Sequence, residues 1–151
     1  MAGAAIRGRL VAGLLLLALG PSPALAVSSA PSSDLPDISA IRAQIYGGDH
    51  EKAIAALLEL TQTVQHAELY NLLGYSHRSL GRHEEAGKYY REALFLDPSH
   101  RGALEYQGEL FITTGNLDGA RTNLRYLQLL CGEKGCAEEE QLRKALAEAE
   151  P

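Results

Sequence analysis

The sequence lacks the short motifs that mark the most common catalytic sites. It has no Gly-x-Ser-x-Gly segment for a nucleophilic serine, no Gly-Lys-Ser/Thr phosphate loop and no His-Glu-x-x-His zinc motif. Its five histidines include no pair at helical spacing with an acidic neighbour. We therefore expect a protein that is not an enzyme and that uses no cofactor and no metal.

The sequence is also poor in positive charge. It has 14 Lys and Arg against 19 Asp and Glu, which gives a formal net charge of -5 at pH 7. Nucleic acids and anionic membrane surfaces attract basic proteins and repel acidic ones. We therefore expect no nucleic-acid partner.

The apolar run at residues 10–19 is too short for a permanent membrane-spanning helix, because spanning needs roughly 20 apolar residues. Two arginines precede this run, and the small-residue site Ala24-Leu25-Ala26 follows it, which is the pattern of a secretory signal peptide. We expect residues 1–26 to be a signal peptide and residues 27–36 to be a disordered linker. The mature chain would then be exported without a stable membrane anchor, to the periplasm if the source is bacterial and otherwise as a secreted protein.

The sequence has only two cysteines, Cys131 and Cys136, which bracket Gly132-Glu133-Lys134-Gly135. Two glycines in so short a segment let the chain turn back, and an oxidising compartment favours a disulfide between the two sulfurs. The alternative is a redox or metal-handling accessory protein that uses these two thiols. The spacing is not Cys-x-x-Cys, and an oxidising compartment disfavours the free thiolates that zinc needs, so we favour the disulfide.

What the sequence does contain is a repeat unit, which extends from Ala67 to His100. Its pattern is a bulky residue, Leu-Gly and a second bulky residue, followed by Gly, Ala, an aromatic residue, Ala and a closing Pro. The positions are Tyr70, Leu73, Gly74, His77, Gly81, Ala86, Tyr90, Ala93 and Pro98. This pattern resembles the tetratricopeptide repeat (TPR) family, in which each repeat is a helix–turn–helix unit.

The pattern recurs in weaker form on both sides of this unit. A shift by one repeat length towards the C-terminus places Gly108, Gly115 and Ala120 on the matching positions, and a nearly equal shift in the other direction does so for Gly48 and Ala53. We therefore expect an all-α, TPR-type helical solenoid of three helix pairs, at about 37–66, 67–100 and 101–131. Residues 132–151 should form the Cys-bracketed turn and a capping helix.

Several small or polar residues have expected structural roles in this arrangement. Gly74 and Gly108 should lie where paired helices approach closely, since a side chain there would separate them. His77 should be a ring at the edge of the core with a polar contact. His50, His83 and His100 fall in or beside turns, where a solvated histidine is ordinary.

The resemblance implies that the first helix of each pair lines a groove for a protein or peptide partner. The outward-facing positions of these helices combine aromatic, basic and acidic side chains, and Tyr and Arg are enriched in binding hot spots. The positions are Arg42, Ile45, Tyr46, Glu68, Asn71, Leu72, Tyr75, Arg78, Glu105, Tyr106, Glu109 and Ile112. The competing interpretation is that they are only the solvated face of each helix.

The groove residues also bear on the chemistry of the partner. Some TPR domains hold a C-terminal carboxylate with Asn and basic residues, but Leu72, Gly102 and Tyr106 occupy those positions here. The glutamates instead favour a peptide segment of basic character. The chain itself should be a monomer or a weak homo-oligomer.

Overall fold

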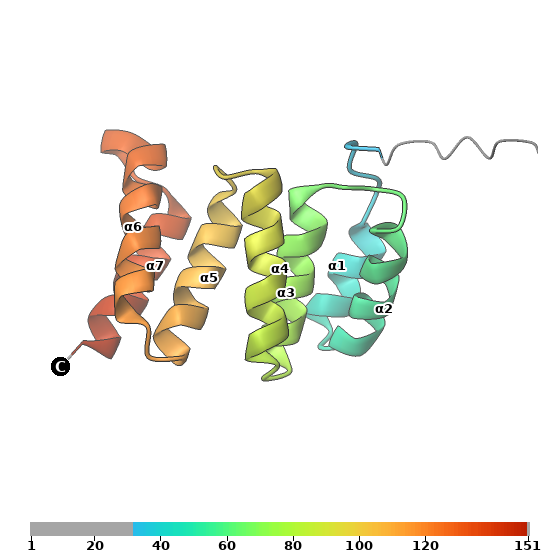
Figure 1. The fold of residues 1–151 in the computed structure, drawn as a ribbon, viewed down its shortest axis with the longest axis horizontal. Helices are drawn as coiled ribbons and strands as arrows, with labels where there is room; N and C mark the ends of the chain where they lie inside the picture. Colours follow the sequence, from blue (N-terminus) through green and yellow to red (C-terminus); the bar gives the residue numbers. More distant parts are fainter. Residues whose placement is uncertain (1–31, 151) are drawn as a thin grey trace, which may run out of the picture.

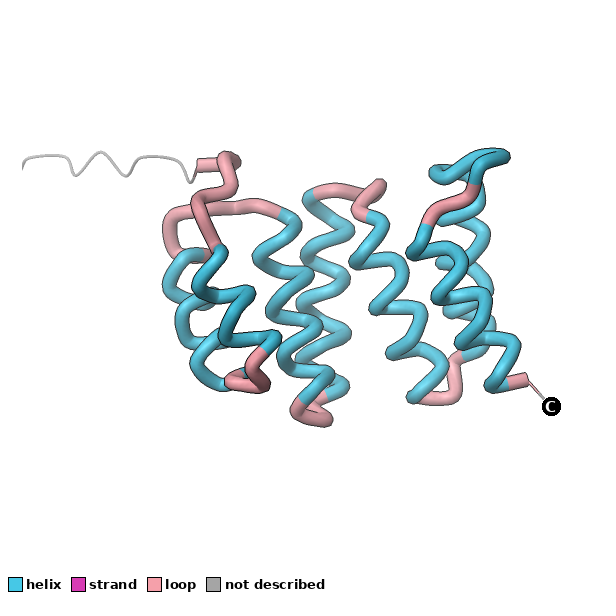
Figure 2. The backbone as a smooth tube through the Cα atoms, turned by 180° about the vertical axis from the view of Figure 1, so that it is seen from behind, coloured by secondary structure: helices cyan, strands magenta, loops and turns pink. Residues whose placement is uncertain are grey.

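The computed structural model describes residues 32–150, which form seven α-helices side by side in a row (Figure 1). Consecutive helices run in alternate directions, so their connecting loops lie at the two edges of the row (Figure 2). The expected all-α solenoid of three helix pairs and a final helix is confirmed. The helices are α1 (Ser39–Tyr46), α2 (His50–Leu60), α3 (Ala67–Ser79), α4 (His83–Leu96), α5 (Arg101–Thr113), α6 (Leu117–Cys131) and α7 (Ala137–Ala149), with a 3-10 turn, η1, at Gly132–Lys134.

Each helix pair is closed by a glycine at an equivalent position of the turn. Gly48, Gly81 and Gly115 have φ of +82°, +72° and +80°, a backbone conformation that L side chains rarely adopt. The space around each of them is open, so the backbone angle and not crowding is what requires glycine. These turns return α2, α4 and α6 against the helices that precede them.

The core follows the row of helices as three consecutive clusters. The first joins α1, α2 and α3, and includes Ile41, Leu57 and Leu73. The second places the fully buried Tyr90 of α4 against Leu110 of α5. Since each cluster joins only neighbouring helices, every pair depends on the next one for its burial.

The two interior helix glycines meet different partners. A Cβ on Gly74 would lie 2.5 Å from the ring of Tyr90, so the expected close approach between the paired helices α3 and α4 is confirmed. A Cβ on Gly108 would meet Leu142 of α7 at 2.6 Å. The expectation for Gly108 was therefore wrong in its partner, because the capping helix fills the space and not the paired helix α6.

The last helix is held by packing and by a disulfide. Leu142 and Leu146 are its buried residues, and Leu142 joins Leu104 and Leu127 in the third core cluster. Cys131 and Cys136 form the expected disulfide, with their Cα atoms 5.5 Å apart. Helix α7 therefore covers the end of the third pair and is tied to it at its N-terminal end.

At the other end of the fold, the described part of the expected linker, residues 32–36, contacts the loop between α2 and α3. Ser32 donates its amide to the carbonyl of Thr63 at 2.9 Å and accepts from the amide of Gln65 at 2.8 Å. The expected signal peptide and residues 27–31 lie outside the described residues. Among the helices that are described, none has the length and apolar character to cross a bilayer.

Candidate functional site

A hollow of about 100 Å³ lies on the face that α1, α3 and α5 form together, which we call the groove face. Tyr75 and Tyr106 provide aromatic walls, and Arg42 and Glu68 provide charge. All eight lining residues are among those expected from the repeat register. They are Arg42, Ile45, Tyr46, Glu68, Asn71, Leu72, Tyr75 and Tyr106.

Glu68 is the centre of the charge network in this hollow. Its carboxylate accepts from Arg42 at 2.5 Å and from the Asn71 amide at 3.1 Å, and it lies 3.1 Å from His100 Nε2. Burial raises the pKa of Glu68, but the hydrogen bonds from His100 and Asn71 and the charge of Arg42 outweigh burial and hold that pKa below its usual value. The network therefore keeps Glu68 ionised and joins α1, α3 and the start of α5.

His100 is a site residue that the sequence reasoning missed. Its Nδ1 accepts the amide proton of Ala103 at 3.1 Å and so caps α5, and its Nε2 faces Glu68. The expectation of a solvated turn histidine was wrong here. A signal was available: His66 holds the equivalent position one repeat earlier and caps α3 in the same way, through the amide of Glu68.

Two tyrosines and an arginine form the middle of the groove face. The rings of Tyr75 and Tyr106 are 5.1 Å apart between centroids, and the guanidinium of Arg78 lies 5.8 Å and 5.6 Å from those centroids. Arg78 also pairs with Glu109 at 2.6 Å, which links α3 to α5. Burial raises the pKa of Tyr106 to about 12, so its hydroxyl stays neutral. This group offers flat aromatic surface beside a charge that is already paired.

Glu105 occupies a different environment at the α7 side of the groove face. It is 3% exposed, and within residues 32–150 its Oε1 has no hydrogen-bond partner. Burial, together with the charges of Glu109 and Glu138, raises its pKa to about 7, and Arg78 only partly opposes this. Glu105 is thus a buried acid that the described part of the chain does not neutralise.

The remaining expected groove residues range from fully covered to fully open. Asn71, Leu72 and Ile45 are buried, so they form the floor of the groove face and not a solvated surface. Tyr46 is 84% exposed and stands at the rim of the hollow. Ile112 packs against the third core cluster. The expected set therefore contains floor, wall and rim positions.

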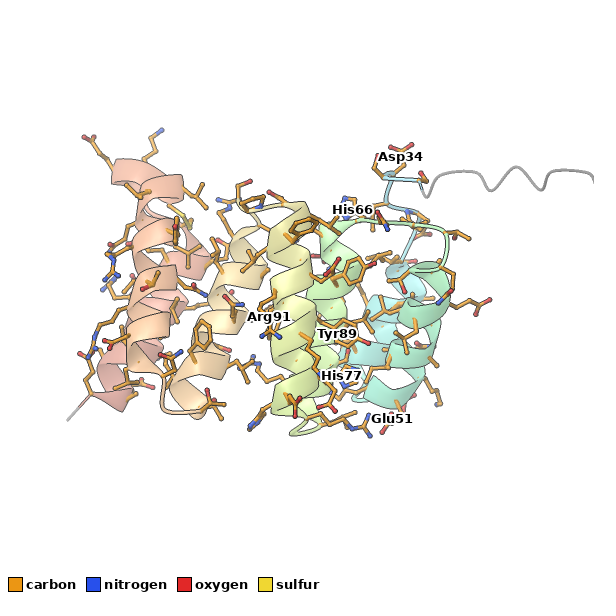
Figure 3. The ribbon with its side chains drawn as sticks, viewed as in Figure 1. Asp34, Glu51, His66, His77, Tyr89 and Arg91 are labelled. Carbon is orange, nitrogen blue, oxygen red and sulfur yellow. A yellow bond between two sulfur atoms is a disulfide. The ribbon has the colours of Figure 1, made fainter. Side chains whose placement is uncertain are left out.

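Away from the groove face, His77 of α3 packs against α4. Its ring stacks on Tyr89 with centroids 5.1 Å apart, and Figure 3 shows the two side chains beside each other, with Glu51 of α2 nearby. Neither ring nitrogen has a hydrogen-bond partner among the residues that the structure describes. The expected polar contact of His77 was therefore wrong, because an aromatic ring takes its place. Burial, then the charge of Arg82, lowers the pKa of His77.

The two cysteines offer no free thiol, because they are bonded to each other. Within residues 32–150, no three His, Cys, Asp or Glu side chains are placed to hold a metal ion together. The chemistry that the groove face does support is binding, through aromatic surface, buried hydrogen-bond acceptors and fixed charges.

These features define a helical-repeat protein with a recessed face along its first helices. Residues 39–100 and 88–129 match the family model for the tetratricopeptide repeat, which covers more than half of the chain. The chain belongs to the tetratricopeptide repeat family, and the resemblance seen in its sequence is confirmed. Membership supports a role in protein–protein interaction.

Solved structures share this fold at low sequence identity. One is a T3SS complex from Aeromonas hydrophila, with a TM-score of 0.65 and 19% identity over 74% of this chain and 76% of that chain. Another is PcrH in complex with the chaperone binding region of PopB, with a TM-score of 0.62 and 23% identity over 72% of this chain and 88% of that chain. These similarities establish the fold alone. No curated protein is significantly similar in sequence.

Proposed function

We propose that this chain is a non-catalytic, exported TPR protein that binds a peptide segment of another protein on its groove face. The observation that carries the proposal is the hollow lined by Tyr75, Tyr106 and Asn71, in which aromatic walls surround a floor that still has hydrogen-bonding capacity. Aromatic side chains supply large contact area with little loss of conformational freedom, which suits a binding surface. PcrH, a structural neighbour, was solved with a region of its partner PopB, which supports a protein segment as the ligand here.

The character of the ligand follows from how the groove charges are used. Glu68 and Glu109 are already paired with arginines, whereas Glu105 has no such partner within residues 32–150. A segment with basic side chains complements this surface, and an acidic segment meets uncompensated negative charge. Apolar or aromatic side chains of the same segment would fill the hollow between the tyrosines.

The proposal is tested by affinity capture from the native envelope fraction, followed by quantitative mass spectrometry. Wild-type protein should enrich one or a few proteins, and the double variant Tyr75→Ala with Tyr106→Ala should lose most of that enrichment. Tyr126→Ala is the matched control, because Tyr126 is an exposed tyrosine of α6, which does not line the hollow. Equal capture by the double variant and the wild type would rule out the groove face as the binding surface.

The exported location needs its own test. Fractionation of the source cells should place the chain in the periplasm or the medium, and N-terminal sequencing should begin at Val27. A protein found in the cytoplasm with its N-terminal segment intact up to Ala26 would overturn this part of the proposal.

A further inference from the structure

Two buried acceptors on the groove face lack a hydrogen-bond partner among the described residues. They are Asn71 Oδ1 on α3 and Glu105 Oε1 on α5, and their residues are 4% and 3% exposed. The two residues occupy the same place in consecutive repeats. Asn71 lines the hollow, and Glu105 holds the equivalent position one repeat later on α5. Buried acceptors of this kind call for donors, which a bound ligand can supply.

The two acceptors differ in charge and in how their side chains are held, and this difference decides which ligand group each can bind. The nitrogen of Asn71 donates to Glu68, so Asn71 is held in place, and its Oδ1 has no donor within residues 32–150. Glu105 has no ion pair within residues 32–150, and Arg78, whose positive charge opposes the raised pKa of Glu105, is bound to Glu109. A buried carboxylate without a partner raises the free energy of the folded protein. A cation that pairs with this carboxylate removes that cost and therefore gains affinity.

The charges around Glu105 select for a cation. Glu109 lies on the same helix and Glu138 comes from α7, and among the described residues the charge that opposes them at Glu105 is Arg78 of α3. Since Arg78 is already paired, the balance at this point of the groove face is negative. That field attracts Lys or Arg and repels Asp, Glu or a terminal carboxylate.

We infer that Glu105 is the subsite for a Lys or Arg side chain of the bound segment, and that this contact sets the specificity of the groove face for basic peptides. The inference rests on the proposed function and sharpens it. The ammonium or guanidinium group would form a charge-assisted hydrogen bond with the carboxylate, and Glu109 and Glu138 would add attraction at longer range.

This assignment has a consequence for the pH dependence of binding. Free Glu105 has its pKa raised to about 7 by burial and by Glu109 and Glu138, against the opposing charge of Arg78, so neutral solution contains both protonation states. A bound cation favours the charged state and lowers that pKa. Affinity for a basic peptide should therefore be full above about pH 8 and should fall as the pH drops through 7 towards 5.

The test uses the full chain and an array of short random peptides. The strongest binder is then synthesised in matched forms with each Lys or Arg replaced in turn by Gln, and dissociation constants are measured by fluorescence anisotropy. One such replacement should weaken binding to the wild type about 10-fold to 100-fold, which corresponds to one charge-assisted hydrogen bond. Glu105→Gln should weaken binding of the unmodified peptide by the same factor. The replacement of Lys or Arg by Gln in the peptide should then cause no further loss of affinity for this variant. Glu59→Gln, the same change at an exposed site on α2, is the control.

The outcomes separate this inference from the proposed function. If Tyr75→Ala with Tyr106→Ala abolishes binding but Glu105→Gln does not change it, the groove face stands and the Glu105 subsite is rejected. If the binders contain no Lys or Arg, the subsite is rejected as well. If no peptide binds, or if binding survives the tyrosine changes, the proposed function fails and the subsite fails with it.

Discussion

The junction between α3 and α5 and the junction between α5 and α7 each carry an acid, and the two acids are in opposite electrostatic states. At the first junction Glu68 faces Arg42, Asn71 and His100, and its pKa lies below the usual value. At the second junction Glu105 faces other carboxylates, and its pKa is raised to about 7. Whether an acid on this face is paired thus depends on the side chains that the neighbouring helices supply, which are Arg42 and His100 for Glu68 and Glu138 for Glu105.

The largest expected effects come from the two side chains that pack directly against the helix glycines Gly74 and Gly108. Tyr90 is fully buried against Gly74, so Tyr90→Ala should lower the free energy of unfolding by about 4 kcal/mol. Leu142→Ala, which empties the space beside Gly108, should cost about 3 kcal/mol, because α7 can settle into part of that space. Urea unfolding followed by circular dichroism gives both values. Leu129→Ala, at a highly exposed position on α6, should change stability by less than about 0.5 kcal/mol. Equal costs at Leu129 and Leu142 would mean that α7 is not a capping helix.

The next prediction contrasts the two acids directly. Glu105→Gln should stabilise the fold at pH 7 by about 1–3 kcal/mol, because it removes a buried charge that no side chain of residues 32–150 pairs with. Glu68→Gln should destabilise it by about 1–2 kcal/mol, because it breaks an ionised network.

The pH dependence of these variants checks the sign of each effect. The raised pKa of Glu105 means that its protonated form favours folding, so its contribution is full below pH 4.5 and is lost as the pH rises through 7. The lowered pKa of Glu68 gives a contribution that is full above pH 4.5 and is lost as the pH falls through the folded value. Urea titrations from pH 4 to 8 should therefore show a flatter curve for Glu105→Gln between pH 4.5 and 7. If the Glu105→Gln variant has the same pH dependence as the wild type, the pKa of Glu105 is not raised in the folded protein.

A third prediction concerns the link that ties α7 to the rest of the row. The double change of Cys131 and Cys136 to Ser should lower the free energy of unfolding by about 2 kcal/mol, as the loop that they close is short. A thiol titration of the protein purified from its native source should find both cysteines oxidised. A pair that is readily reduced, or that carries metal as isolated, would instead support the redox or metal-handling alternative.

Much of this fold could be predicted from the sequence because its determinants are local and repeated. The helix pairs follow from the spacing of Leu73, Gly74 and Ala86, and the turns from Gly81 and its equivalents. The disulfide also followed from the short Gly-containing segment between the two cysteines, and the capping helix was expected within residues 132–151. These features depend on residues close together in the chain, so a pattern of one repeat length carries them.

What could not be predicted were contacts set by stacking and by side-chain competition. The sequence placed Glu68, Glu105 and Glu109 together as groove carboxylates, but only the packed structure assigns Arg42 to the first and Arg78 to the third. His100 was missed because its role depends on Glu68, which lies in the preceding helix pair, on α3. Leu142 could not be matched to Gly108 because α7 has no second helix to mark it as part of the repeat.

The smallest effect tests whether the α3–α5 network goes beyond helix capping. His66→Ala removes a cap alone and should cost about 1 kcal/mol, whereas His100→Ala removes a cap and the contact with Glu68 and should cost about 1.5 kcal/mol. His100→Asn should recover the capping part, since Asn is a good N-cap, but not the Glu68 part. In a Glu68→Gln background the two alanine changes should cost nearly the same. If the difference in cost survives in that background, His100 does not act through the Glu68 carboxylate, and the network ends at Arg42 and Asn71. If the difference disappears, the contact between His100 and Glu68 is the part of the α3–α5 junction that stabilises the fold beyond the helix cap.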